Sequence, residues 1–373
     1  MSRNNVNGTP LLSLHLPAPP RLGIADSDDF GDNDSQSRKR WYHYLPLLMA
    51  IVMILGPHPS LLIVFVRYHY LVHGLILQPV LHALVVYALT FMAFSSLIVV
   101  LARDPGPVND KSQGEDADDG EEEDFMQALL SPPEGEEAHG PGKWCKKCNA
   151  PKPERAHHCG ACGRCVLKMD HHCMWLGHKC IGHRTHASFV HLLICVTTLS
   201  VYIAALCASV VWWSFMHPLN IDEWTPVHAM FLAFYGIVIS MVIGSFCIYH
   251  IYLVSTNQTT IESLSPFMLL RYLPPLPDNV DSRKLSDPPQ EHELSFEQRL
   301  LVRAAHRHIR LYDVGFKKNW AQVFGWSRPW GWVYRLLIGG SCTGDGKTFP
   351  RNPRSDEMLN RLASELVSAD KDR

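Results

Sequence analysis

Long apolar runs without charged residues divide the chain into segments. Four runs have about the length of a bilayer-spanning helix, and they cover residues 45–66, 80–101, 188–215 and 227–254. A buried core helix of a large soluble protein is the other interpretation of one such run. Because four occur in one chain, the pattern predicts an all-α integral membrane protein with four transmembrane helices, whose second and third helices flank a Cys-rich domain.

Polar segments fill the space between the runs. Residues 1–40, rich in Pro, Asn, Ser, Asp and Gly, are expected to form a disordered tail, and residues 110–140 an acidic, disordered insert. We also expect a short exposed helix after Pro350. The expected divisions are 1–40 (tail), 41–102 (transmembrane helices 1 and 2), 103–142 (linker with the insert), 143–187 (Cys-rich domain), 188–255 (transmembrane helices 3 and 4), 256–325 (C-terminal segment) and 326–373 (variable tail).

Basic residues indicate the orientation. Lys and Arg are frequent before the first run, between the second and third, and after the fourth. The connector at residues 67–79 holds only Arg67, and the one at residues 217–226 holds none. By the positive-inside rule, both termini and the Cys-rich domain are expected in the cytosol. The formal net charge of −2 argues against a nucleic acid as partner.

Seven of the 11 cysteines lie within residues 145–180, and their spacing suggests metal binding. Cys145 and Cys148 form one pair separated by two residues, Cys159 and Cys162 form another, and Cys165 follows at the same interval. Such pairs are typical of structural zinc sites, whereas free thiols or disulfides are the alternative. With His157, His158 and His172 nearby, the segment offers enough ligands for two Cys3His sites that would supply much of its folding energy.

Eight ligands satisfy two zinc ions, and seven cysteines together with several histidines therefore leave at least one cysteine over. Cys173 is the natural candidate because it follows Asp170, His171 and His172 directly. An imidazole can take the proton of a thiol, and a carboxylate can orient that imidazole. Cys173 also lies a few residues before the third run, where a lipid-derived substrate could reach it.

Asp170-His171-His172-Cys173 within this arrangement resembles the DHHC family of protein S-acyltransferases (palmitoyltransferases). Three further motifs agree in order with the family: Asp104-Pro105-Gly106, Lys152-Pro153-x-Arg155-x-x-His158-Cys159 and Thr259-Thr260-Ile261-Glu262. Residues 312–325, with Asn319-Trp320, resemble its aromatic C-terminal motif. The resemblance covers about residues 45–325.

The resemblance implies a role for each matching residue. Cys173 would be the acylated nucleophile, His171 the general base and Asp170 its orienting carboxylate. Thr260 and Asn319 would support the active site. One zinc site would be Cys145, Cys148, His158 and Cys165, and the other Cys159, Cys162, His172 and Cys180.

Three positions depart from the family pattern. Six residues rather than five separate Cys173 from Cys180, Met174 replaces a Pro, and Thr185 replaces an Asn. The extra residue leaves open whether Cys180 or His178 completes the second zinc site.

The resemblance implies transfer of a long-chain acyl group, palmitoyl foremost, from acyl-CoA to a cysteine of protein substrates at the cytosolic face. It also implies two structural Zn²⁺ ions, contact with membrane lipid, and a place in an endomembrane (ER, Golgi or vacuole) or the plasma membrane. Two alternatives exist. A membrane-anchored zinc module that recruits partners would not explain Cys173, and a metal transporter would need a repeated ligand pattern that the runs lack.

Overall fold

The computed structural model describes residues 41–108, 144–275, 286, 288–328 and 330–371. The expected tail at residues 1–40 and the expected acidic insert at residues 110–140 lie outside the described residues. Residues 276–285 and 287 also lie outside the described residues.

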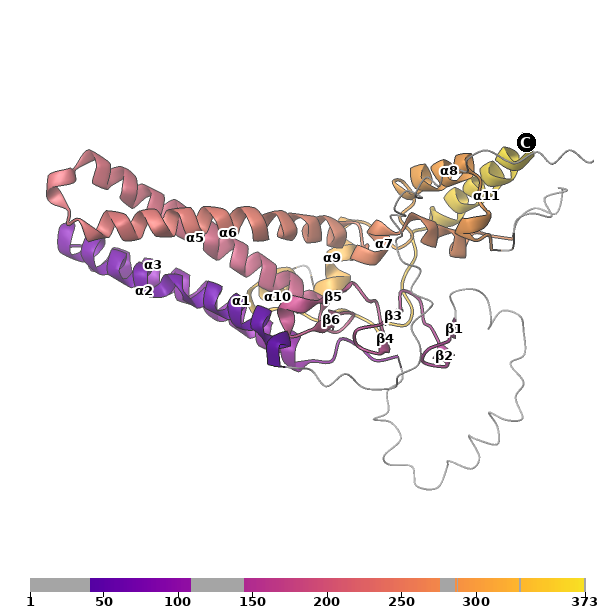
Figure 1. The fold of residues 1–373 in the computed structure, drawn as a ribbon, viewed down its shortest axis with the longest axis horizontal. Coiled ribbons are helices and arrows are strands. Elements are labelled where there is room, and N and C mark those ends of the chain that lie inside the picture. The colour runs from indigo at the N-terminus through magenta and orange to yellow at the C-terminus, as the bar shows by residue number, and fades with distance from the viewer. Residues whose placement is uncertain (1–40, 109–143, 276–285, 287, 329, 372–373) are drawn as a thin grey trace, which may run out of the picture. The chain divides into compact units, whose positions relative to one another are not determined.

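Long helices form the membrane part of the chain (Figure 1). Within the described residues, four segments are long and apolar enough to cross a membrane: Trp41–Val72, Leu77–Ala102 (α3), His186–Met216 (α5) and Trp224–Ser255 (α6). The first segment joins η1 (Trp41–Tyr44), α1 (Leu45–Leu55), α2 (Pro57–Val64) and η2 (Phe65–Val72). The prediction of a four-span membrane protein is confirmed.

The first span is longer than its apolar run suggested. The sequence pattern places Arg67 in the connector between the first two spans. In the structure the helix continues to Val72 through η2, which is a π-helix. The guanidinium of Arg67 donates a 2.7 Å hydrogen bond to Asp222, which lies just before α6. A charge that finds a partner beside the end of a neighbouring span need not end its own helix, so the expected connector at residues 67–79 shrinks to residues 73–76.

Helices α5 and α6 approach closely at Gly236. A Cβ atom built on Gly236 would lie 2.7 Å from the Ser200 carbonyl oxygen and 2.8 Å from the Ala204 nitrogen. Small residues allow membrane helices to pack backbone against backbone. Many of the outward side chains are large and apolar, such as Phe91 and Met241. This distribution suits a surface in contact with lipid.

The Cys-rich segment between α3 and α5 consists of three antiparallel two-stranded sheets. The pairs are β1 (Trp144–Cys145) with β2 (Ala150–Pro151), β3 (His157–Cys159) with β4 (Arg164–Val166), and β5 (His171–Cys173) with β6 (Lys179–Ile181). The sequence prediction did not include these strands. They are only two or three residues long, which is too short for an alternating apolar pattern.

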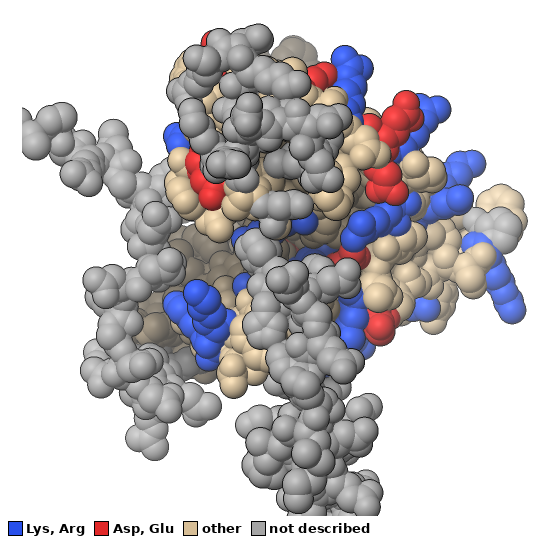
Figure 2. Space-filling view, turned by 90° about the vertical axis from the view of Figure 1, so that its right-hand side faces the viewer, with Lys and Arg blue, Asp and Glu red and all other residues tan. Residues whose placement is uncertain are grey.

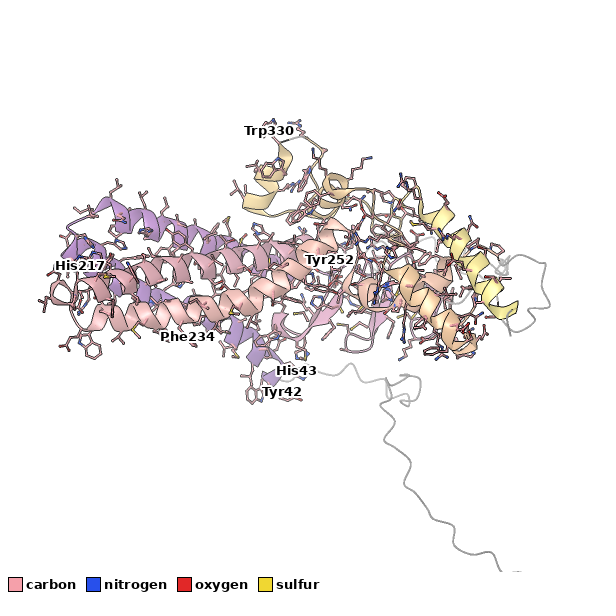
Figure 3. All side chains as sticks on the ribbon, turned by 90° about the horizontal axis from the view of Figure 1, so that it is seen from above. Tyr42, His43, His217, Phe234, Tyr252 and Trp330 are labelled. Carbon is pink, nitrogen blue, oxygen red and sulfur yellow. The ribbon has the colours of Figure 1, made fainter. Side chains whose placement is uncertain are left out.

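The segment after α6 is mainly helical. Its elements are α7 (Thr260–Leu264), η7 (Pro266–Tyr272), η8 (Glu291–Glu293), α8 (Phe296–His306), α9 (Phe316–Phe324), α10 (Gly331–Ile338) and α11 (Ser355–Lys371). In Figure 3, Trp330, directly before α10, lies at about the same level along the spans as Tyr252 near the end of α6.

The helix expected after Pro350 is not simply exposed. Helix α11 has 17 residues, and Leu359, Leu362 and Leu366 on one side are buried against α8 and η7. The side chain of Gln298 in α8 donates a 3.0 Å hydrogen bond to the Leu366 carbonyl. Most of the other α11 residues are polar. The composition of this segment therefore suggested an exposed helix, although its leucines form an apolar stripe that packs against α8 and η7.

We expect Gly236→Ala to lower the thermal unfolding temperature of the purified protein in detergent. The new methyl group must push α5 and α6 apart, and such overpacking typically costs about 1–3 kcal/mol. Gly244→Ala on the same helix is the matched control, because its nearest contact would be the Thr197 Cγ2 atom at 3.4 Å. Equal unfolding temperatures for the two variants would contradict the close packing at Gly236.

Candidate active site and metal centres

Two groups of four Cys and His side chains gather in the Cys-rich segment. Within each group the donor atoms lie within 4.8 Å of one another. The members are Cys145, Cys148, His158 and Cys165 in the first cluster, and Cys159, Cys162, His172 and Cys180 in the second. These are the two sets that the family resemblance implied.

The distances in both clusters fit a tetrahedral zinc ion. The Nδ1 atom of His158 lies 3.2 Å from the Cys148 sulfur and 3.9 Å from the Cys165 sulfur. The Nδ1 atom of His172 lies 3.4 Å from the Cys162 sulfur and 3.7 Å from the Cys180 sulfur. With usual Zn–S and Zn–N bond lengths, a tetrahedron places such atoms about 3.6 Å apart. Both donor sets can therefore hold Zn²⁺ with little rearrangement.

Strand pairing explains how ligands distant in sequence meet. His158 of β3 lies opposite Cys165 of β4, and His172 of β5 lies opposite Cys180 of β6. Directly paired residues have neighbouring side chains on the same face of the sheet. Each hairpin therefore supplies one His and one Cys, and a nearby Cys pair completes the group.

The extra residue before Cys180 lies outside the paired strands. Residues 174–178 connect β5 to β6, so the connection absorbs it while His172 and Cys180 remain opposite each other. The side chain of His178 is not a member of the second cluster; its ring centroid lies 4.4 Å from that of His43. His157, which was also considered as a ligand, belongs to neither cluster.

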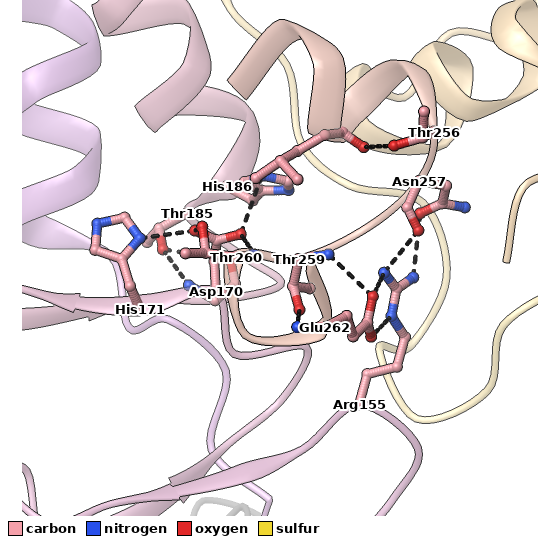
Figure 4. Close-up of polar contacts among 12 residues, drawn as sticks. Arg155, Asp170, His171, Thr185, His186, Thr256, Asn257, Thr259, Thr260 and Glu262 are labelled. Carbon is pink, nitrogen blue, oxygen red and sulfur yellow. Dashed lines mark hydrogen bonds and ion pairs between the residues drawn. The ribbon is translucent and has the colours of Figure 1, made fainter. Parts of the chain in front are cut away.

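The carboxylate of Asp170 joins the Cys-rich segment to the chain after α6 (Figure 4). It accepts hydrogen bonds from Nδ1 of His171 at 2.7 Å, from the Thr260 hydroxyl at 2.7 Å and from the Thr260 backbone N–H at 2.9 Å. Burial alone would raise the pKa of Asp170. The hydrogen bond from His171 and nearby histidines outweigh burial and hold this pKa well below its usual value, so the carboxylate is charged at neutral pH.

His171 lies between Asp170 and Cys173. Burial alone would lower the pKa of His171, but the hydrogen bond to Asp170 and the contact with Cys173 raise it to about 9. Cys173 itself is half-buried and belongs to neither metal cluster. The structure thus brings together the three residues at which the sequence predicted nucleophilic chemistry.

Arg155 ties the same two parts of the chain together a second time. Its buried guanidinium donates to both carboxylate oxygens of Glu262 at 2.7 and 2.8 Å, and to Asn257. The ring of Tyr312 lies 4.2 Å away and that of Phe349 5.0 Å away. Burial alone would lower the pKa of Arg155, but Glu262 outweighs it and raises this pKa.

The helix that carries Thr260 has its own support. The Thr259 side chain accepts a hydrogen bond from the Glu262 backbone, and the Glu262 side chain accepts one from Thr259 N–H. This capping box fixes the first turn of α7. Thr260, the first residue of α7, therefore offers both its N–H and its hydroxyl to Asp170.

Asn319, the second expected supporting residue, holds α9 against the end of α6. Its side-chain amide donates to the Ser255 carbonyl at 2.8 Å and to Asp313 at 2.7 Å. The neighbouring Trp320 ring donates to the Ser255 hydroxyl at 3.0 Å. Asn319 thus acts on the chain around α6 and lies outside the set of groups that contact Asp170.

Sequence reasoning missed several residues around this site. The sequence shows Arg155 only as part of a motif, and it indicates no role near Asp170 for Asn257, His186 or His250. The motif position of Arg155 could have pointed to it. Asn257 has a positive φ of 48° and bonds to Tyr312 and Gln322, which no local pattern indicates.

The fold and site together define a membrane protein with two Cys3His clusters beside a Cys-His-Asp arrangement. Comparison with known families agrees: residues 138–266 match the model of the DHHC palmitoyltransferase family. This part of the chain is a DHHC palmitoyltransferase domain.

Curated relatives carry the same description. The chain is 32% identical to palmitoyltransferase PFA3 of Gibberella zeae over 281 residues, which are 61% of this chain and 50% of that protein. It is 43% identical to palmitoyltransferase pfa3 of Neurospora crassa over 144 residues (38% and 22%). It is 29% identical to palmitoyltransferase ZDHHC15A of Danio rerio over 222 residues (57% and 53%). The chain thus matches about half or less of each relative's length.

We expect each of the two clusters to hold one zinc ion in the purified protein, and Cys180→Ser and Cys145→Ser each to contain one zinc ion fewer than the wild type. Replacing one thiolate in either cluster leaves only three ligands for that ion. His178→Ala is the matched control for the second cluster and should retain both ions. Elemental analysis of the purified variants measures this. Loss of one ion from His178→Ala, with two retained by Cys180→Ser, would reverse the ligand assignment.

Proposed function

We propose that the protein is a protein S-acyltransferase that moves a long-chain acyl group from acyl-CoA to a cysteine of a protein substrate through acyl-Cys173. The observation that carries this proposal is the place of Cys173. Its thiol lies outside both metal clusters and next to an imidazole whose other nitrogen is held by a buried carboxylate. Such a set supplies a thiolate nucleophile.

In the first step His171 takes the proton of Cys173, and the thiolate attacks the thioester carbonyl of acyl-CoA. The carbon–sulfur bond to CoA breaks, and the departing CoA thiolate receives the proton from His171. In the second step His171 takes the proton of a substrate cysteine, whose thiolate attacks acyl-Cys173. Cys173 leaves as a thiolate and receives from His171 the proton that came from the substrate cysteine. Each step exchanges one thioester for another, so the main task is to position the reactants.

The surroundings of Cys173 suit a lipid chain. Its side chain packs against an apolar cluster at the ends of the spans, which includes Leu97, Val100, Phe189 and Val190. An acyl group on the sulfur can therefore extend among apolar side chains of α3 and α5. This contact favours a fatty acyl donor over a small polar one.

Basic residues at one end of the molecule favour an acyl donor that carries phosphate groups. They also favour a cytosolic location for this end of the molecule. Lys and Arg side chains gather at the end of the molecule that carries the Cys-rich segment (Figure 2). Lys146 and Lys147 in the first Cys pair are both exposed. By the positive-inside rule this end faces the cytosol, where acyl-CoA, protein substrates and reduced thiols are available. The two clusters would each hold a structural Zn²⁺ that stabilises the folded segment.

We expect Cys173→Ser to abolish both autoacylation and transfer when the protein is supplied with labelled palmitoyl-CoA. The serine hydroxyl is far less nucleophilic than a thiolate, and its ester would not exchange with a substrate thiol. Cys342→Ser is the matched control, because Cys342 packs against the same apolar cluster and lies in neither metal group. If Cys173→Ser is labelled and transfers the acyl group as fast as the wild type, Cys173 is not the nucleophile.

We expect Asp170→Asn to slow acylation by about 10²–10⁴-fold at pH 7 and to change its pH dependence. In the wild type, His171 can hold the proton of Cys173 up to pH about 9, so the rate stays level between pH 7 and 9. Without the carboxylate the pKa of His171 falls, so His171 holds the proton of Cys173 less well at neutral pH, and more of the thiolate forms only as the pH rises. The rate of the variant should therefore rise across the same range.

Single-turnover labelling at several pH values measures this effect. Thr260→Val, which removes one hydrogen bond to Asp170 but keeps the carboxylate, is the comparison variant. It should retain the level profile of the wild type. Parallel profiles for the wild type and Asp170→Asn would contradict the role of Asp170.

A further inference from the structure

Two buried histidines lie beside Asp170 and take no part in the proposed reaction. His186 is the first residue of α5 and is 2% exposed, and His250 of α6 is 0% exposed. One donor atom from each histidine and one from Asp170 lie within 4.8 Å of one another. His186 Nε2 is 4.0 Å from Asp170 Oδ1.

Neither histidine has a hydrogen bond that would explain its burial. Among the described residues, none of the four ring nitrogens of His186 and His250 has a hydrogen-bond partner. A buried polar group left without a partner lowers the stability of the fold. Aromatic rings surround His250, with centroids 4.5 Å away at Phe246 and 5.0 Å away at Phe189. Two adjacent imidazoles without partners in such surroundings suggest a ligand that accepts their lone pairs.

We propose that Asp170, His186 and His250 form a third site, which binds a transition-metal dication such as Zn²⁺. Two imidazoles and one carboxylate are a donor set that suits Zn²⁺ and similar ions. The carboxylate is charged and has lone pairs besides those that accept the hydrogen bonds from Thr260 and His171. Binding would shorten the 4.0 Å separation to the roughly 3.3 Å expected between tetrahedral ligands.

This site differs in kind from the two Cys3His clusters. It has three protein ligands in place of four, and none of them is a thiolate. Four-ligand thiolate sites hold zinc as part of the fold. The third site is formed from residues that the spans and Asp170 already position, so its ion is not needed for folding.

An ion in the third site would act on the proposed reaction. Asp170 holds His171 through one oxygen, and a dication on the other oxygen draws charge away from that hydrogen bond. His171 is then less well oriented to take the proton of Cys173. The site is therefore inhibitory, and this consequence rests on the proposed function, whereas ion binding itself does not.

Metal content tests the site without relying on activity. Full-length Cys173→Ser protein, which cannot be acylated there, is loaded with Co²⁺ in detergent and then analysed for metal and for visible absorption. We expect three ions per chain, the third adding ligand-field bands without the sulfur charge-transfer bands of the thiolate clusters. In the Cys173→Ser background, His250→Phe and His186→Gln should each bind two ions, and the two retained ions show that the Cys-rich segment remains folded.

Only two ions in the parent protein, or three in both histidine variants, would overturn the proposal and leave the histidines as packing residues. In proteins that retain Cys173, added Zn²⁺ should slow autoacylation by about tenfold or more, in line with the effect of disturbing a residue that orients a ligand. The rate of His250→Phe, whatever its starting level, should not change with Zn²⁺. If the wild type and His250→Phe are slowed equally by Zn²⁺, the third site is not inhibitory. Whether the site binds an ion at all is decided by the metal count.

Discussion

The carboxylate of Asp170 is the interaction on which the rest of the site depends. It is buried, charged, and bonded both to His171 in the Cys-rich segment and to Thr260 after α6. A buried charge is stable only when several donors compensate it. The requirement to satisfy this one group therefore fixes the Cys-rich segment against the ends of the spans, and Arg155 with Glu262 reinforces that contact.

The Cys-rich segment has little apolar material of its own. Its buried cluster comprises Cys159, Val166, Met169 and Cys180, and two of these residues are metal-cluster members. Short hairpins with such a small core are marginal without further support. Metal ions inside the segment and the carboxylate contact at its edge would together replace the core that a larger domain builds from apolar side chains.

Cys173 is located where these two kinds of environment meet. On one side are the polar groups that Asp170 organises, and on the other is the apolar cluster at the ends of α3 and α5. A reaction between a lipid thioester and a protein thiol needs both. The same location explains why His186 and His250, which belong to spans, lie close enough to Asp170 for the proposed shared metal site.

Composition and short spacing were sufficient to predict several features of this protein. Four apolar runs predicted the spans, and pairs such as Cys145 and Cys148 predicted the metal clusters, because both signals are local. The tertiary structure alone decided which distant residues meet: His250 with Asp170, Arg155 with Glu262, and the apolar side of α11 with α8. These partners are far apart along the chain, and Arg155 and Glu262 are separated by 107 residues. No local sequence pattern indicates such a contact, since packing brings the residues together only after the spans and hairpins have formed.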